Sequence, residues 1–159
     1  LTDFLRTGTY DARRTFYKTT SPSMDILISS NLERLLYHVS GSSEKVAGWM
    51  QELSATGKYT VDAETLAKIQ QSFAAGYADD ADGAAEIKAR FDGDHYLCDT
   101  HTAVAFRVAE TRRTDAPMVV LSTASPFKFP RDVLTALGGE APANRRDRCR
   151  GSRLAARAG

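Results

Sequence analysis

The sequence has 159 residues, which suits one domain with a hydrophobic core, and its 42% hydrophobic and 26% charged residues are ordinary for a globular protein. No apolar run approaches the roughly 18 to 20 residues of a membrane-spanning helix, so no membrane partner is expected. The start at Leu1 has no Met and none of the features of a signal peptide, and we interpret it as a cut inside a longer protein. The two cysteines, Cys98 and Cys149, are too few for a disulfide scaffold and favour a cytoplasmic location.

Charge is unevenly distributed along the chain. Residues 145–159 are rich in arginine, while the rest of the chain is mildly acidic. A basic tail can bind nucleic acid or a membrane surface. This tail has no interleaved aromatic residues and belongs to no recognisable module, so no nucleic-acid partner is predicted.

Apolar residues at helical spacing predict that most of the chain is helical. The clearest helix follows Ser30 and Glu33, which form a capping-box pattern, and its apolar residues recur at i, i+3, i+4 and i+7 until Gly41 ends it. Residues 9–20 are expected to be irregular, and 59–61 to be extended. Helices are predicted at 2–6, 30–40, 43–54, 62–76, 84–91, 102–112 and 131–137, and Met24, Trp49 and Phe73 are expected in the core.

The clearest strand is predicted at 117–122. Its sequence, PMVVLS, is a nearly continuous apolar run, as expected of a strand that is buried on both faces. Helices in series with one late buried strand indicate the α/β class. Because one strand cannot form a sheet alone, we expect the chain to be part of a domain whose other strands lie outside it.

Four ordered segments resemble threonine synthase. They are LTDFLRTGTYDARR (1–14), SPSMDILISSNLERLLYH (21–38), AGYADD (75–80) with DTHTAVAF (99–106), and VVLSTASPFKFP (119–130). The resemblance covers 1–140 and implies the carboxy-terminal part of a fold-type-II, tryptophan-synthase-β-like enzyme that uses pyridoxal 5′-phosphate (PLP).

The resemblance also implies a reaction. The family is a lyase of threonine biosynthesis that converts O-phospho-L-homoserine and water to L-threonine and phosphate. It places the Schiff-base lysine and the Gly/Asn-rich phosphate loop upstream of these segments, so the chain is expected to be a fragment that is inactive alone. The alternatives are another fold-type-II lyase or dehydratase, or a non-catalytic binding module with a basic tail.

The cofactor-binding candidates are Thr123 and Ser122, which follow the predicted strand. Open α/β sheets bind ligands outside the carboxyl ends of their strands. In similar enzymes the threonine of this STA motif meets the pyridine nitrogen of PLP, where a neutral hydroxyl tunes the ring as an electron sink. The alternative is a threonine that satisfies the backbone of a turn.

Candidates for the substrate pocket are His101, Thr102 and Arg34. His101 and Thr102 lie at a predicted helix N-terminus, which favours an anion such as the substrate carboxylate or phosphate. The alternative is a capping sequence in which His101 forms a structural hydrogen bond. Arg34 could bind an anion, or it could form a solvated pair with Glu33.

Two further patterns are not assigned to chemistry. Lys128 lies between two phenylalanines that could desolvate its amine, but the resemblance places the PLP lysine upstream, so we interpret Lys128 as structural. The spacing His95-x-x-Cys98-x-x-His101 matches no standard zinc site, so no metal is predicted.

The resemblance stops near Glu140. Residues 141–159 are rich in Ala, Arg and Gly, whose codons are GC-rich, and they lack a periodic apolar pattern. We therefore expect a tail that does not belong to the family, either disordered or the product of a frameshift.

Overall fold

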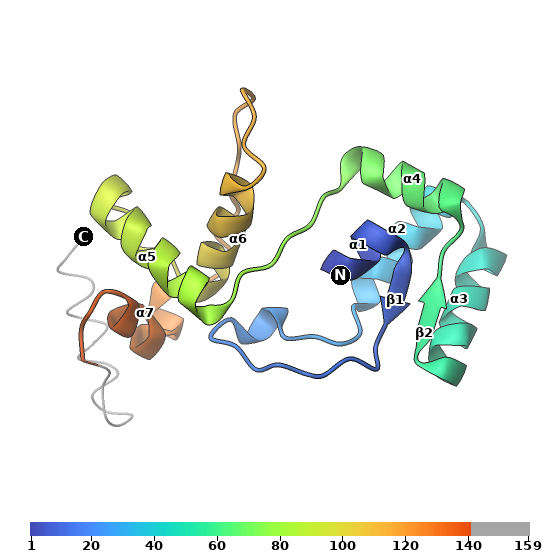
Figure 1. Ribbon diagram of the computed structural model, residues 1–159, viewed down its shortest axis with the longest axis horizontal. Coiled ribbons are helices and arrows are strands. Elements are labelled where there is room, and N and C mark those ends of the chain that lie inside the picture. Colours follow the sequence, from blue (N-terminus) through green and yellow to red (C-terminus); the bar gives the residue numbers. More distant parts are fainter. Residues whose placement is uncertain (141–159) are drawn as a thin grey trace. The chain divides into compact units, whose positions relative to one another are not determined.

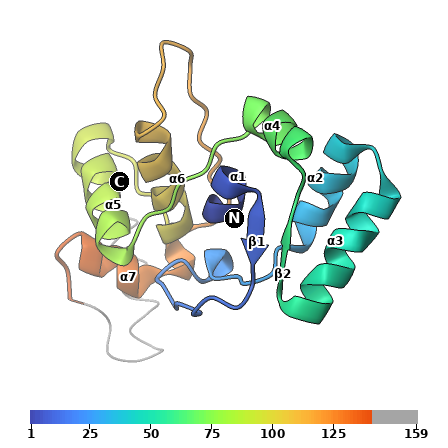
Figure 2. The same cartoon turned by 45° about the vertical axis from the view of Figure 1, so that its right-hand side comes forward.

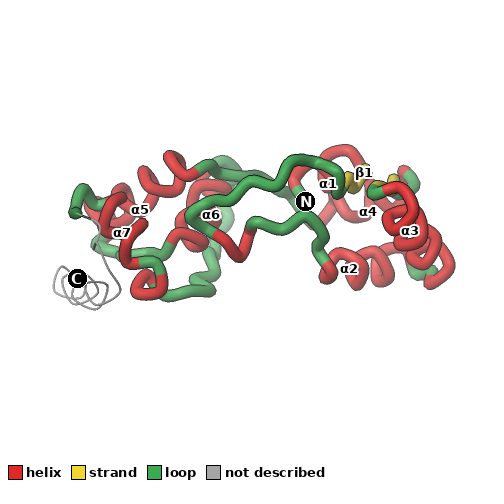
Figure 3. The backbone as a smooth tube through the Cα atoms, turned by 90° about the horizontal axis from the view of Figure 1, so that it is seen from below, coloured by secondary structure: helices red, strands yellow, loops and turns green. Residues whose placement is uncertain are grey.

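The computed structural model describes residues 1–140, which form two compact units (Figure 1). The first unit contains residues 1–17 and 25–76, and the second contains residues 18–24 and the described residues from 77 onward. Helices dominate, and in the described part strands occur only in the first unit (Figure 3). No helix within residues 1–140 is both long enough and apolar enough to cross a bilayer. The elements are α1 (Thr2–Thr7), β1 (Thr9–Asp11), η1 (Pro22–Met24), α2 (Ser30–Ser40), α3 (Ser43–Thr56), β2 (Lys58–Thr60), α4 (Ala63–Ser72), α5 (Asp80–Asp94), α6 (Thr100–Glu110), η2 (Pro126–Lys128) and α7 (Pro130–Ala136).

The first unit is built around an antiparallel pair, β1 and β2, which lie side by side in Figure 2. Tyr10 pairs with Tyr59 across the two strands, and their rings stack with centroids 5.5 Å apart. Phe4 of α1 packs against both rings at about 6 Å. Buried residues of α2, α3 and α4 complete this core, namely Leu32, Leu36, Val46 and Ile69.

The second unit packs α5 against α6 and α7. Ile87, Cys98, Ala103 and Val133 form its core. Beside this core, Arg90 of α5 forms ion pairs within its own helix and a pair with Glu110 of α6, at 3.1 Å. The Arg90 guanidinium also lies 5.0 Å from the centroid of the Phe106 ring. These contacts tie α5 to the C-terminal half of α6, the helix whose N-terminus carries several candidate residues.

The predicted strand at 117–122 is wrong for the described chain. The segment forms no strand there, and Val119 and Leu121 are 80% and 72% exposed. The backbone of residues 118–121 forms no hydrogen bond with any described residue. A strand exists only through pairing, and residues 1–140 supply this segment with no neighbouring strand.

Other differences follow from local capping. Ser29, not Ser30, is the N-cap of α2 and its side chain makes no capping bond, so the predicted capping box does not form. Helix α5 begins at Asp80 rather than at residue 84, because the Asp79 carboxylate accepts a hydrogen bond from the Asp82 N–H. Residues 9–20 are not wholly irregular, since β1 lies among them.

Two of the three expected core residues are wrong. Met24 is 45% exposed and Phe73 is 47% exposed, because each lies at or beyond the end of its helix rather than on its packed face. Trp49 is half-buried and packs against the core of the first unit.

Candidate functional site

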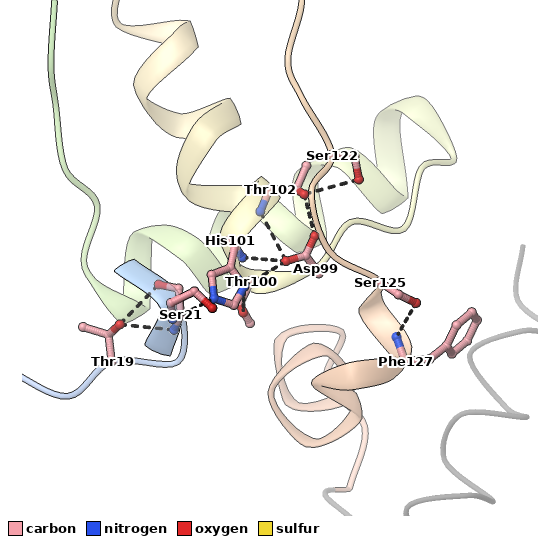
Figure 4. Close-up of polar contacts among 10 residues, drawn as sticks. Thr19, Ser21, Asp99, Thr100, His101, Thr102, Ser122, Ser125 and Phe127 are labelled. Carbon is pink, nitrogen blue, oxygen red and sulfur yellow. Dashed lines mark hydrogen bonds and ion pairs between the residues drawn. The ribbon is translucent and has the colours of Figure 1, made fainter. Parts of the chain in front are cut away.

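The candidate site is organised by Asp99, which is fully buried and caps α6 (Figure 4). Its Oδ1 accepts hydrogen bonds from the backbone N–H of His101 at 2.8 Å and of Thr102 at 3.4 Å. Its Oδ2 accepts the Thr102 hydroxyl proton at 2.5 Å. Burial alone would raise the pKa of Asp99, but hydrogen bonds from the Thr102 hydroxyl and from His101 outweigh burial and hold the pKa below its usual value.

His101 is only 4% exposed, and both of its ring nitrogens have partners. Nδ1 lies 3.1 Å from Asp99 Oδ1, and Nε2 accepts the backbone N–H of Ser23 at 3.1 Å. Because an ionised carboxylate can only accept, Nδ1 carries the proton, and a neutral Nε2 is free to accept from Ser23. His101 therefore joins the turn at η1 to the start of α6, which agrees with its interpretation as a structural hydrogen-bonder.

Thr102 connects this buried carboxylate to the predicted cofactor segment. Its hydroxyl oxygen lies 3.4 Å from Ser122 Oγ, across 20 residues of sequence (Figure 4). Thr102 is 1% exposed, whereas Ser122 and Thr123 are both exposed. The structure thus brings Thr102 and Ser122 together, and the next residue, Thr123, is exposed.

The remaining candidates lie elsewhere. Arg34 belongs to the first unit, where its exposed guanidinium donates to Asn31 Oδ1 at 2.9 Å. Lys128 is exposed at the end of η2. His95 is an exposed left-handed residue after α5, while Cys98 is buried, and residues 1–140 contain no group of three or more potential metal ligands.

A cleft of about 470 Å³ also lies in the second unit. Its lining comes from α5, α7, the N-terminus of α6 and the segment before η1, and it includes Thr20, Asp80, Thr100 and Arg131. Asp80 is already occupied, because its Oδ1 accepts both the backbone N–H and the hydroxyl of Thr20 at about 3 Å. Ser122 and Thr123 are not among its lining residues.

The role of Asp99 is the main feature of the site that was not predicted. Asp99 lies in the capping sequence before His101 and Thr102, but that pattern does not indicate that its second oxygen accepts the Thr102 hydroxyl proton. A signal was present in the spacing Asp99-x-x-Thr102, because a residue three positions after an N-cap can return a side-chain hydrogen bond to it.

Comparisons with known proteins give a consistent result. The family model described as "Threonine synthase, C-terminal" matches residues 102–152. The threonine synthase of Pseudomonas aeruginosa is 38% identical over 143 residues, which are 88% of this chain and 30% of that protein. The PLP-bound threonine synthase from Brucella melitensis is 40% identical, with a TM-score of 0.83 over 96% of this chain and 33% of that one. In sequence and fold, the chain matches the carboxy-terminal part of threonine synthases.

The yeast threonine synthase structure supports the same relationship, at 32% identity and a TM-score of 0.81 over 91% of this chain. These matches confirm the resemblance and the predicted fold class. The chain spans between a fifth and a third of the length of the relatives that it matches. The proposed tail, residues 141–159, lies outside the described residues, and its separation from the family region stays a prediction.

Proposed function

We propose that the chain forms part of the PLP- and substrate-binding region of a threonine synthase. The reaction would convert O-phospho-L-homoserine and water to L-threonine and phosphate, as a cytoplasmic lyase step of threonine biosynthesis. The observation that carries this proposal is the 40% identity and close structural match to a PLP-bound threonine synthase over nearly the whole chain.

Two residues of this chain suit one atom of the cofactor, its pyridine nitrogen. The exposed hydroxyls of Ser122 and Thr123 are the type of group that can hydrogen-bond a pyridine nitrogen. When bound, PLP would supply an electron sink for the carbanions of the reaction. The part of this chain would be to hold and orient the ring through this Ser-Thr pair, with Thr123 as the first candidate from the resemblance.

The other candidates have less direct roles. Thr102 would act through Ser122, and His101 would hold the η1 turn against α6, since both of its nitrogens are already bonded. Arg34 remains a proposed contact for the phosphate or carboxylate of the substrate. Lys128 is not proposed as the Schiff-base lysine, which the resemblance places outside this chain.

A chimera tests the function. The matching third of the Brucella melitensis threonine synthase would be replaced by this chain, and phosphate release from O-phospho-L-homoserine would be measured with added PLP. We expect phosphate and threonine in equal amounts, and about a tenfold loss of rate on Thr123→Val, with partial recovery in Thr123→Ser, from the loss of one hydrogen bond to the ring. A chimera that binds PLP but only dehydrates serine or threonine would favour the alternative lyase. A folded chimera that binds no PLP would refute the proposal.

A further inference from the structure

The start of α2 carries a capping signal that the structure does not use. Ser30 and Glu33 have the spacing of a capping box, yet the helix begins at Ser30, and Ser29 is its N-cap. The Ser29 side chain makes no capping hydrogen bond. Ser30 and Glu33 are both exposed, and within residues 1–140 neither side chain forms a hydrogen bond or an ion pair. Both halves of the capping box are therefore available.

Tyr10 of β1 holds the residues before α2 instead. Its hydroxyl donates to the Leu27 carbonyl at 2.8 Å and accepts the backbone N–H of Ser29 at 2.8 Å. A phenol hydroxyl has one proton and can also accept, so the two bonds form together. Tyr10 is only 5% exposed and its ring stacks on Tyr59, which fixes the position of the hydroxyl. The hydroxyl thus satisfies two backbone groups that a neighbouring strand would otherwise bond.

The capping box and the Tyr10 bonds exclude one another. In the box, Ser30 would be the extended N-cap residue, with its hydroxyl on the Glu33 N–H. In the structure Ser30 is helical, and the Ser29 carbonyl accepts the Leu32 N–H at 3.2 Å. Tyr10 and Leu32 lie in the same core. A change of backbone conformation at Ser30 would therefore carry Ser29 away from the Tyr10 hydroxyl.

Burial decides which arrangement is favoured. Leu27 and Ser29 are half-buried, so loss of Tyr10 would leave a carbonyl and an N–H that water reaches poorly. Ser30 and Glu33 are exposed, so their groups can bond water when the box is absent. The observed start of α2 is therefore preferred while the Tyr10 hydroxyl is in place. Once that hydroxyl is removed, the box supplies the better cap.

We propose that α2 has two alternative starts and that Tyr10 selects between them. While its hydroxyl holds Leu27 and Ser29, the helix begins at Ser30. When the hydroxyl is withdrawn, the capping box forms and the helix begins at Asn31. The chain passes from the second compact unit to the first between residues 24 and 25, so release of residues 27–29 also lengthens the free connection that leads into α2. This inference does not rest on the proposed function.

The first test uses Ser30→Ala, which removes the box and leaves the Tyr10 bonds intact. Unfolding of the chain in urea is followed by Trp49 fluorescence. In the parent, Ser30→Ala should change the unfolding equilibrium constant by less than about twofold. In a Tyr10→Phe background it should raise that constant about fivefold, as loss of an N-cap does. The matched control is Tyr59→Phe, which removes a hydroxyl from the stacked ring, and there Ser30→Ala should again have less than about a twofold effect. Equal effects of Ser30→Ala in the parent and in Tyr10→Phe would overturn the inference.

The second test observes the start of α2 directly by NMR. The Cα and Cβ chemical shifts of Ser30 should be helical in the parent and in Tyr59→Phe, and should become those of an extended N-cap residue in Tyr10→Phe. Exchange of the Ser30 amide should slow in Tyr10→Phe, and Glu33→Ala should reverse this because the box loses its carboxylate. Helical Ser30 shifts in Tyr10→Phe, or N-cap shifts in the parent, contradict the inference. If Tyr10→Phe unfolds the chain alone, the same shifts are measured in the chimera, where the rest of the enzyme supports the fold, and the same two outcomes decide.

Discussion

Replacing Asp99 by Ala should open the second unit far more than an ordinary cap deletion. Loss of an N-cap costs about 1 kcal/mol. Here the change also strands two buried donors, His101 Nδ1–H and the Thr102 hydroxyl, at about 1 to 3 kcal/mol each. After partial relaxation we expect about 3 kcal/mol, which is roughly a 100-fold rise in the opening equilibrium.

The thiol of Cys98 reports this opening. It is fully buried next to Asp99, and burial raises its pKa to about 11, so it should react with a disulfide reagent only when the unit opens. The assay is the labelling rate of Cys98 in a Cys149→Ser background, at fixed pH and in the slow-labelling regime. Asp99→Ala should label roughly 100-fold faster than the parent.

Two matched variants make the result interpretable. Asp99→Asn keeps the capping oxygen and should raise the labelling rate by about tenfold or less. Asp62→Ala removes the N-cap of α4, whose carboxylate is partly exposed, and should change Cys98 labelling less than Asp99→Ala does. Equal labelling of the parent and Asp99→Ala would show that the carboxylate network does not hold the start of α6.

Three further changes test the two cores and one surface pair. Arg90→Ala should lower the free energy of unfolding, measured in urea, by about 3 kcal/mol, because Glu86 is only 7% exposed and loses its ion-pair partner. Arg90→Lys should lower it by less, and equal losses in the two variants would exclude a role for the guanidinium geometry. Leu36→Ala, at a fully buried site, should cost about 2 to 5 kcal/mol in unfolding followed by Trp49 fluorescence, and a change below about 1 kcal/mol would contradict the packed core. Hydrogen bonds from the backbone N–H of Thr65 and from Lys45 lower the pKa of Asp62 to about 2. The contribution of ionised Asp62 to folding stability is therefore complete above about pH 4 and is lost as the pH falls toward 2, and screening at this partly exposed site limits it to about 1 kcal/mol. Asp62→Asn should remove that part of the dependence of stability on acid pH.

Local signals predicted the helices well. Asp62 caps α4 through the Thr65 N–H, and Gly41 and Gly57 end α2 and α3 in the left-handed conformation that glycine adopts without strain. Each signal depends on residues within four positions of one another. Such patterns survive in any longer protein that contains the segment.

Non-local pairing was the part that sequence could not supply. Strand β1 was missed because Thr9, Tyr10 and Asp11 pair with residues 47 to 51 positions away, and nothing within residues 9–20 identifies that partner. The burial of single apolar residues also depends on distant parts of the chain. Whether Phe73 is buried depends on what lies beyond the end of α4, and in the described chain it is 47% exposed.

The candidate site combines both kinds of information. The Asp99–Thr102 contact spans three residues and follows from the geometry of a capped helix, so its position could be predicted. The contact with Ser122 crosses 20 residues and depends on how the exposed segment 117–121 returns to α6. That segment has apolar side chains, and its backbone groups have no hydrogen-bond partner within residues 1–140. Both features favour burial between neighbouring strands. Ser122 is thus held on one side by its contact with Thr102 of α6. Pairing of segment 117–121 with a neighbouring strand would hold it on the other side. A variant such as Thr102→Val should therefore disturb Ser122 most where that strand pairing is absent.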